Sequence, residues 1–159
     1  MARGTANQYL ASNASGVLSW TTPNSTLSVI RTNLAANQLL GTAGWQIVNF
    51  STVVIDTNSE FAANRFTATR AGIYEINAGY HTDDQSNAQF YSIGVYVNGA
   101  LYQQTTQNHS NLGPVSRNIN CVVNLAAGGF VEIFAENYQA TVNLDAFPGK
   151  TFFEVRQIR

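Results

Sequence analysis

The chain has 159 residues, enough for one compact domain with a substantial core. Charged residues make up only 11% of it and the formal net charge is −1, so its surface has no long-range field that would attract nucleic acid or anionic lipid. A single cysteine, Cys121, excludes an intrachain disulfide and a cysteine metal cluster, and no apolar run approaches the ~18 residues of a membrane span. We therefore expect a soluble protein that binds neither nucleic acid nor membrane.

The first part of the chain is uncharged. No Lys, Arg, Asp or Glu occurs from Ala6 to Val29, and Ser, Asn and Ala are frequent there. Between these small residues lie scattered apolar side chains: Tyr9, Leu10, Val17, Leu18 and Trp20. Such spacing lets an extended backbone pair with another surface while its apolar side chains anchor it. We expect an extended docking arm, although the composition also fits a disordered tail.

Only Leu27 to Gly41 has helix-like apolar spacing, which predicts a short helix or an irregular linker. We therefore divide the chain into an arm with its linker, residues 1–44, and a head, residues 45–159.

The head consists of short runs of alternating apolar and polar residues, separated by Gly, Asn, Asp or Pro, which is the strand pattern. The runs are Trp45 to Asp56, Asn64 to His81, Ala88 to Gln107, Ser116 to Asn137, Ala140 to Asp145 and Thr151 to Arg159. Asn98-Gly99 suits a type I′ hairpin, and Gly128-Gly129 a second reversal. About eight to ten strands with unequal connections predict an all-β, two-sheet antiparallel jelly-roll sandwich.

Alternation also assigns the faces of these strands. Three rows are expected to point inward: Tyr74, Ile76, Ala78 and Tyr80; Tyr91, Ile93, Val95 and Val97; and Ile119, Cys121, Val123 and Leu125. The stretch "FVEIFAEN" is apolar on both faces over most of its length. It should be covered by the second sheet on one face and by a neighbouring subunit on the other.

The order of motifs in the head resembles the C1q/TNF-like jelly-roll domain. The matching segments are "NRFTATRAGIYEINAGY", "YVNGALY", "VNLAAGGFVEIFAEN" and "TFFEVRQI", although Gly128-Gly129 stands where the family usually has Gly-Asp. No collagen-like Gly-x-y stalk precedes them, so a complement-type architecture is not expected. The resemblance implies a homotrimer with aromatic packing near a threefold axis, and the candidates are Tyr74, Tyr91, Tyr96, Phe134 and Phe153. A sandwich core would use the same aromatic residues.

The leader has a resemblance of its own. "GTANQYLASNASGVLSW", Gly4 to Trp20, is similar to a segment of tailed-phage fibre and appendage proteins with the form Gly-Thr-x-Asn-Gln-x-Leu, then small residues, then Gly and Trp. The resemblance implies that the arm attaches the head to a virion.

Few residues of the chain suggest chemistry. His81 precedes Asp83 and Asp84, whose carboxylates are candidate Ca²⁺ ligands, but a solvated loop with a turn-forming Asp pair explains them as well. His109 lies in a polar loop with no Cys or carboxylate near it in sequence. No catalytic motif is present, so we expect no enzyme activity and no cofactor.

We therefore expect a non-enzymatic phage structural protein: a homotrimeric knob anchored by its arm to the major capsid protein or another virion protein. Capsid decoration, or cementing, is the leading assignment, and a receptor- or glycan-binding tip of a tail fibre or appendage is the alternative. The polar loops Thr82 to Gln89 and Gln103 to Asn111 would carry the alternative function. The start "MARGTANQYL" lacks the apolar core of a secretory signal, which predicts synthesis in the host cytoplasm and residence in the virion.

Overall fold

The structure is a computed structural model that describes residues 5–6, 8–13, 15–21, 27–41, 44–82, 89–109, 113–138 and 142–158, without the side chains of Gln89 and His109. The described residues form fifteen strands and no helix. The strands are β1 (Tyr9–Ser12), β2 (Leu18–Thr21), β3 (Val29–Asn33), β4 (Gln38–Leu40), β5 (Gln46–Ile47), β6 (Thr52–Asp56), β7 (Phe61–Ala62), β8 (Arg65–Thr67), β9 (Gly72–His81), β10 (Gln89–Val97), β11 (Ala100–His109), β12 (Ser116–Leu125), β13 (Phe130–Asn137), β14 (Val142–Leu144) and β15 (Phe152–Gln157).

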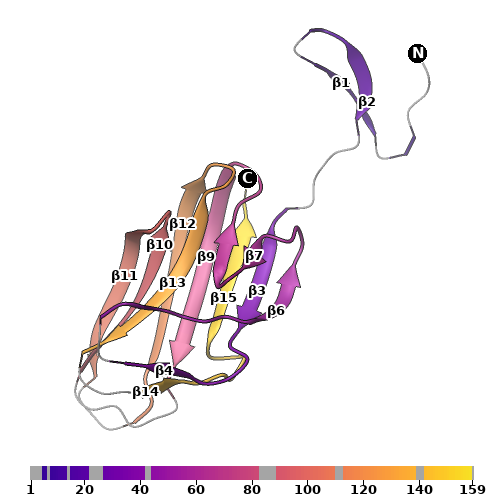
Figure 1. The fold of residues 1–159 in the computed structure, drawn as a ribbon. Coiled ribbons are helices and arrows are strands. Elements are labelled where there is room, and N and C mark those ends of the chain that lie inside the picture. The colour runs from indigo at the N-terminus through magenta and orange to yellow at the C-terminus, as the bar shows by residue number, and fades with distance from the viewer. Residues whose placement is uncertain are drawn as a thin grey trace.

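Two sheets pack face to face and form the head (Figure 1). One sheet has five strands in the order β12-β9-β15-β3-β6. The other has six, in the order β11-β10-β13-β8-β7, with β5 also paired to β13. The short pair β4 and β14 lies across one end of the sandwich (Figure 1). Neighbouring strands are antiparallel, which confirms the predicted two-sheet jelly-roll sandwich.

The core between the sheets follows the predicted alternation. Strand β12 alternates exposed and buried residues along its whole length, so that its asparagines face outward while Cys121 and its apolar neighbours face the core. The inward rows of β9 and β10 are likewise buried, with Val97 partly buried at the end of its row. Burial raises the pKa of the Cys121 thiol to about 11, as expected for a structural cysteine.

The tight turn between β10 and β11 forms as predicted. Asn98 and Gly99 both have positive φ, 52° and 81°, as a type I′ turn requires. The turn is also hydrogen-bonded to β13, the strand beside β10 in the sheet, because the Phe130 amide donates to the Asn98 side-chain oxygen at 2.9 Å.

The expected linker is part of the head. Residues 27–41 form neither a helix nor an irregular segment; they contribute β3 and β4. Strand β3 pairs with β15 on one side and β6 on the other, with Ile30 buried between the sheets. Pairing with two neighbours outweighs the local helix-like spacing. The head thus begins near Leu27 instead of Trp45.

The second face of β13 is partly covered by this chain itself. Phe134 packs against Tyr96 with ring centroids 4.2 Å apart, and Trp45 meets Tyr96 edge-on at 5.9 Å. Further along the strand, Arg65 lies over the Phe130 ring at 3.8 Å. Side chains from β10, β8 and the segment before β5 thus cover part of this face, while Phe130 and Phe134 stay half-buried, and coverage of the rest by a neighbouring subunit stays a prediction.

Candidate docking arm and assembly face

The N-terminal arm is a β-hairpin. Its turn is organised by Asn13, whose side-chain oxygen accepts hydrogen bonds from the amides of Ser15 at 2.9 Å and Val17 at 3.0 Å. Gly16 has φ of 74°, a conformation that glycine adopts without steric cost. The segment of small residues that predicted an extended arm therefore reverses direction, and β1 pairs with β2.

The hairpin register gathers apolar side chains on one side. Leu10 lies directly opposite Trp20, and Ser12 lies opposite Leu18. Residues two apart on a strand share a face, so Leu10, Leu18 and Trp20 lie together while Tyr9 points to the other side. All three remain exposed, as do Tyr9 and Val17, and Trp20 is the least exposed of the five at 38%. The predicted anchors are thus present on the surface of a defined structure.

The hairpin stands clear of the sandwich in Figure 1. A two-stranded hairpin is only marginally stable in water when nothing covers its apolar side. A hairpin with three large apolar residues on one face therefore suits docking onto another protein, where that face becomes buried.

The five aromatic candidates for the trimer interface do not share a surface. Tyr74, Tyr91 and Phe153 are completely buried within one chain, so none of them can reach a second subunit. They are core residues, because alternation turns them toward the opposing sheet. Tyr96 and Phe134 are half-buried on the outer face of the six-stranded sheet, where they pack on each other.

A different surface has the features of an assembly site. Strand β6 is the edge of the five-stranded sheet, and it exposes three consecutive apolar residues, Val53, Val54 and Ile55. Exposed apolar edge strands favour association with another chain. The outward side of the same sheet exposes Ile73 on β9 and Val122 on β12. We call this outward side, together with β6, the assembly face.

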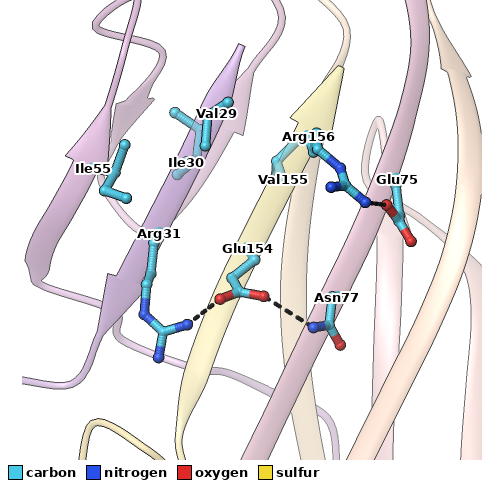
Figure 2. A pocket seen from close by; sticks show the side chains of 9 residues that line it. All are labelled: Val29, Ile30, Arg31, Ile55, Glu75, Asn77, Glu154, Val155 and Arg156. Carbon is cyan, nitrogen blue, oxygen red and sulfur yellow. Dashed lines mark hydrogen bonds and ion pairs between the residues drawn. The ribbon is translucent and has the colours of Figure 1, made fainter. Parts of the chain in front are cut away.

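A ladder of charged side chains crosses the assembly face beside a hollow of about 270 Å³ (Figure 2). Glu154 on β15 forms an ion pair with Arg31 on β3, and it accepts a hydrogen bond of 3.0 Å from Asn77 on β9. Two residues along β15, Arg156 donates to Glu75 at 2.6 Å. These partners are directly opposite in the strand register, so the sheet itself sets the pairing.

The ladder is electrically balanced. The hydrogen bond from Arg156, the one from Asn120 and the Arg156 charge together hold the pKa of Glu75 below its ordinary value. Both carboxylates of the ladder are engaged by guanidinium groups, so neither is available as a general base. The hollow is therefore better suited to burial against a partner surface than to chemistry.

The suggested calcium ligands, Asp83 and Asp84, lie outside the described residues, and so does the His109 side chain. His81 lies 2.7 Å from the Ser116 hydroxyl and 3.1 Å from the Lys150 amine, and a cation beside it disfavours a metal ion. Within the described ranges, no group of three His, Cys, Asp or Glu side chains could hold a metal ion. These residues also contain no helix long and apolar enough to cross a bilayer.

The assembly face was not predicted from the sequence. The run "TVVID" does carry a signal, because three apolar residues in a row without alternation are typical of a strand whose two sides are both covered. The charged ladder carries no such signal. Glu75 and Arg156 are 81 residues apart, and only the strand register brings them together.

No protein-family model and no curated protein sequence matches the chain. Among solved structures, murine APRIL superimposes with a TM-score of 0.65 at 13% sequence identity, over 84% of this chain and all of that one. The globular domain of zebrafish complement 1qA gives 0.63 at 15% identity, over 84% of this chain and 98% of that domain. The fold is the C1q/TNF jelly roll. Eiger TNF from S. frugiperda agrees, with a TM-score of 0.62 at 13% identity over 84% of this chain and 92% of that chain. At these identities the likeness establishes the fold alone.

Proposed function

We propose that the chain is a non-enzymatic structural protein of a phage virion, a homotrimeric knob held on the particle by its N-terminal hairpin. Capsid decoration, in which the knob cements neighbouring coat subunits, is the leading assignment. The observation that carries the proposal is the hairpin, which presents Leu10, Leu18 and Trp20 on one side and stands clear of the head (Figure 1).

The hairpin serves as the attachment device. Its apolar face is too small to fold against itself, and burial of such a face gives roughly 25 cal/mol per Å². The similarity of Gly4 to Trp20 to a segment of tailed-phage appendage proteins supports a virion protein as the partner. The major capsid protein is the partner that decoration requires.

The trimer is supported by the distribution of exposed apolar residues on the head. A ring of three subunits joins two different surfaces of each subunit. Strand β6 exposes Val54 at one edge of the sandwich, and β11 exposes Leu101 and Tyr102 at the other (Figure 1). We infer that the assembly face of one subunit, which includes β6, packs against the Leu101–Tyr102 end of β11 in the next, so that the polar remainder of β11 stays outside the interface.

Threefold symmetry suits decoration of a capsid. A trimer placed where three capsomers meet would contact several coat subunits through three hairpins. Three linked contacts give far higher avidity than one, so modest burial by each arm is sufficient for stable attachment. A cement protein acts through this binding alone and needs no catalytic group.

A receptor- or glycan-binding tip of a tail fibre or appendage is the second candidate. Strand β11 favours it, because β11 exposes an uninterrupted polar run from Gln103 to Asn108. Amide and hydroxyl side chains of this kind hydrogen-bond to sugar hydroxyl groups. Saturable binding of the purified trimer to host cells, but not to particles, would favour this candidate over decoration.

Rebinding to particles that lack the chain tests the decoration proposal. Purified wild-type protein should bind such particles saturably, in multiples of three chains per site, and should raise their resistance to heat. The double variant Leu10→Ala/Leu18→Ala should bind at least tenfold more weakly while its circular dichroism spectrum stays that of a folded head. Equal binding by this variant and the wild type would contradict attachment through the hairpin.

A further inference from the structure

A groove on the outer face of the six-stranded sheet lies opposite the assembly face and is independent of the proposed attachment. It has a volume of about 620 Å³, within the usual range for ligand sites. Its lining combines aromatic and polar side chains: Trp45, Phe90, Ser92, Gln104, Thr106, Glu136 and Tyr138.

The aromatic walls of the groove are held in place by packing. Trp45 packs closely against β10 because Gly94 has no side chain; an added Cβ there would lie 3.0 Å from the indole ring. Phe90 and Tyr138 meet edge-on, with centroids 6.4 Å apart. On the polar side, the Ser92 and Thr106 hydroxyl groups are hydrogen-bonded at 2.8 Å.

Among the described residues that line the groove, Glu136 is the only charged one, and its relative exposure is 6%. Tyr138 donates a hydrogen bond to it, and among the described residues no basic side chain forms an ion pair with it. Its negative charge, with that hydrogen bond, raises the pKa of Tyr138, and it adds to the effect of burial in raising the pKa of Tyr96. The groove therefore has a negative centre surrounded by aromatic rings.

Strand β13 carries a second buried glutamate, Glu132, whose carboxylate already pairs with an arginine of this chain. Glu132 lies four residues before Glu136 on the same side of β13, and it is also nearly buried. Arg65 completes that position: its guanidinium donates to the Glu132 carboxylate at 2.8 and 3.0 Å and lies over the Phe130 ring at 3.8 Å. Carboxylate, guanidinium and aromatic ring thus form one unit at Glu132, whereas Glu136 has the carboxylate and the rings alone.

We propose that the groove binds an arginine side chain presented by a partner protein. A guanidinium placed there would pair with Glu136 and lie against Trp45 or Tyr138, as Arg65 does with Glu132 and Phe130. The Thr106 hydroxyl and the Gln104 amide oxygen are further acceptors for its N–H groups. Arginine fits better than lysine because its planar group can face a ring and a carboxylate at once.

The test is an NMR titration of the full chain with Nα-acetyl-arginine methylamide, and in parallel with the citrulline compound, which is its neutral isostere. The chain has two tryptophans, so the Trp45 indole N–H reports on the groove and Trp20 is an internal control. We expect saturable shifts at Trp45 but not at Trp20, with the citrulline compound binding at least fivefold more weakly. Glu136→Gln should lose the preference for arginine, and Asp145→Asn, which removes one carboxylate outside the groove, should keep it.

Three results would overturn the proposal. One is the absence of a saturable Trp45 shift, and another is equal binding of the arginine and citrulline compounds. The third is binding of a neutral sugar such as methyl glucoside in place of arginine, which would make the groove a saccharide site. The comparison of the two compounds uses the unaltered chain, so it stands even if Glu136→Gln fails to fold.

Discussion

Leu10 and Trp20 lie directly opposite each other across the N-terminal hairpin, on the side that also carries Leu18. The pairing converts apolar residues that are scattered in the sequence into one compact surface. Because two strands cannot bury this surface between themselves, it stays exposed, as the proposed attachment to another protein requires.

Replacing Trp20 with Ala should weaken attachment without unfolding the head. Loss of a large apolar side chain that becomes buried on docking costs about 1.5–3 kcal/mol, so the affinity for particles should fall at least tenfold. The melting temperature of the head should not change. Phe147→Ala is the matched control, because it removes an exposed aromatic ring from the head, and it should leave attachment intact. Loss of β circular dichroism in Trp20→Ala would contradict the separation of arm and head.

Replacing Ile55 with Asp should dissociate the trimer. Ile55 is exposed on β6 within the proposed assembly face, and a charge buried there would lack a partner. Sedimentation velocity at micromolar concentration should give three times the chain mass of 17.3 kDa for the wild type and one chain mass for the variant. Leu39→Asp, at an exposed position on β4, should remain trimeric. A variant at Ile55 that stays trimeric would move the interface elsewhere.

Glu75 should titrate below the ordinary glutamate value of about 4.3. Its pKa is lowered mainly by the hydrogen bond from Arg156. A folded-state pKa below the unfolded one means that this stabilisation is complete above the unfolded value and is lost as the pH falls through the folded value. Carboxyl ¹³C NMR should show the low midpoint in the wild type and a rise toward 4.3 in Arg156→Gln. A wild-type midpoint at or above 4.3 would show that the ion pair does not form.

Phe153→Ala should destabilise the head rather than its assembly. Phe153 is fully buried and packs against Phe50 and Phe61, with ring centroids 5.7 and 6.0 Å away. Removal of such a ring costs about 3–5 kcal/mol in free energy of unfolding, measurable in urea. If this variant kept wild-type stability but became monomeric, Phe153 would belong to the subunit interface after all.

The sequence predicted the head well where strands are long and one face is buried. The rows through Tyr74 and Cys121 and the Asn98-Gly99 turn follow from strict alternation and from local backbone preference, both of which are properties of neighbouring residues. Strand β3 was harder to predict, because this part of the segment Leu27 to Gly41 forms a strand only through pairing with β15 and β6.

The candidate sites depend on information that the sequence does not hold. Aromatic residues such as Tyr74 are equally suited to a core and to an interface, and only burial separates the two roles. The charged ladder needs the register between β9 and β15, which are far apart in the chain. The arm residues were correctly placed on a surface, but the hairpin that gathers Leu10 and Trp20 depends on a turn at Asn13 and Gly16 that was not predicted.

In the role proposed above, this chain is a virion component held in many copies by its arm. The most direct measurement is its copy number per purified particle, by quantitative mass spectrometry against the major coat protein. Decoration predicts a number comparable with the coat subunits. A few copies per particle would contradict decoration and favour a fibre or tail tip, and complete absence from the particle would contradict the virion assignment itself.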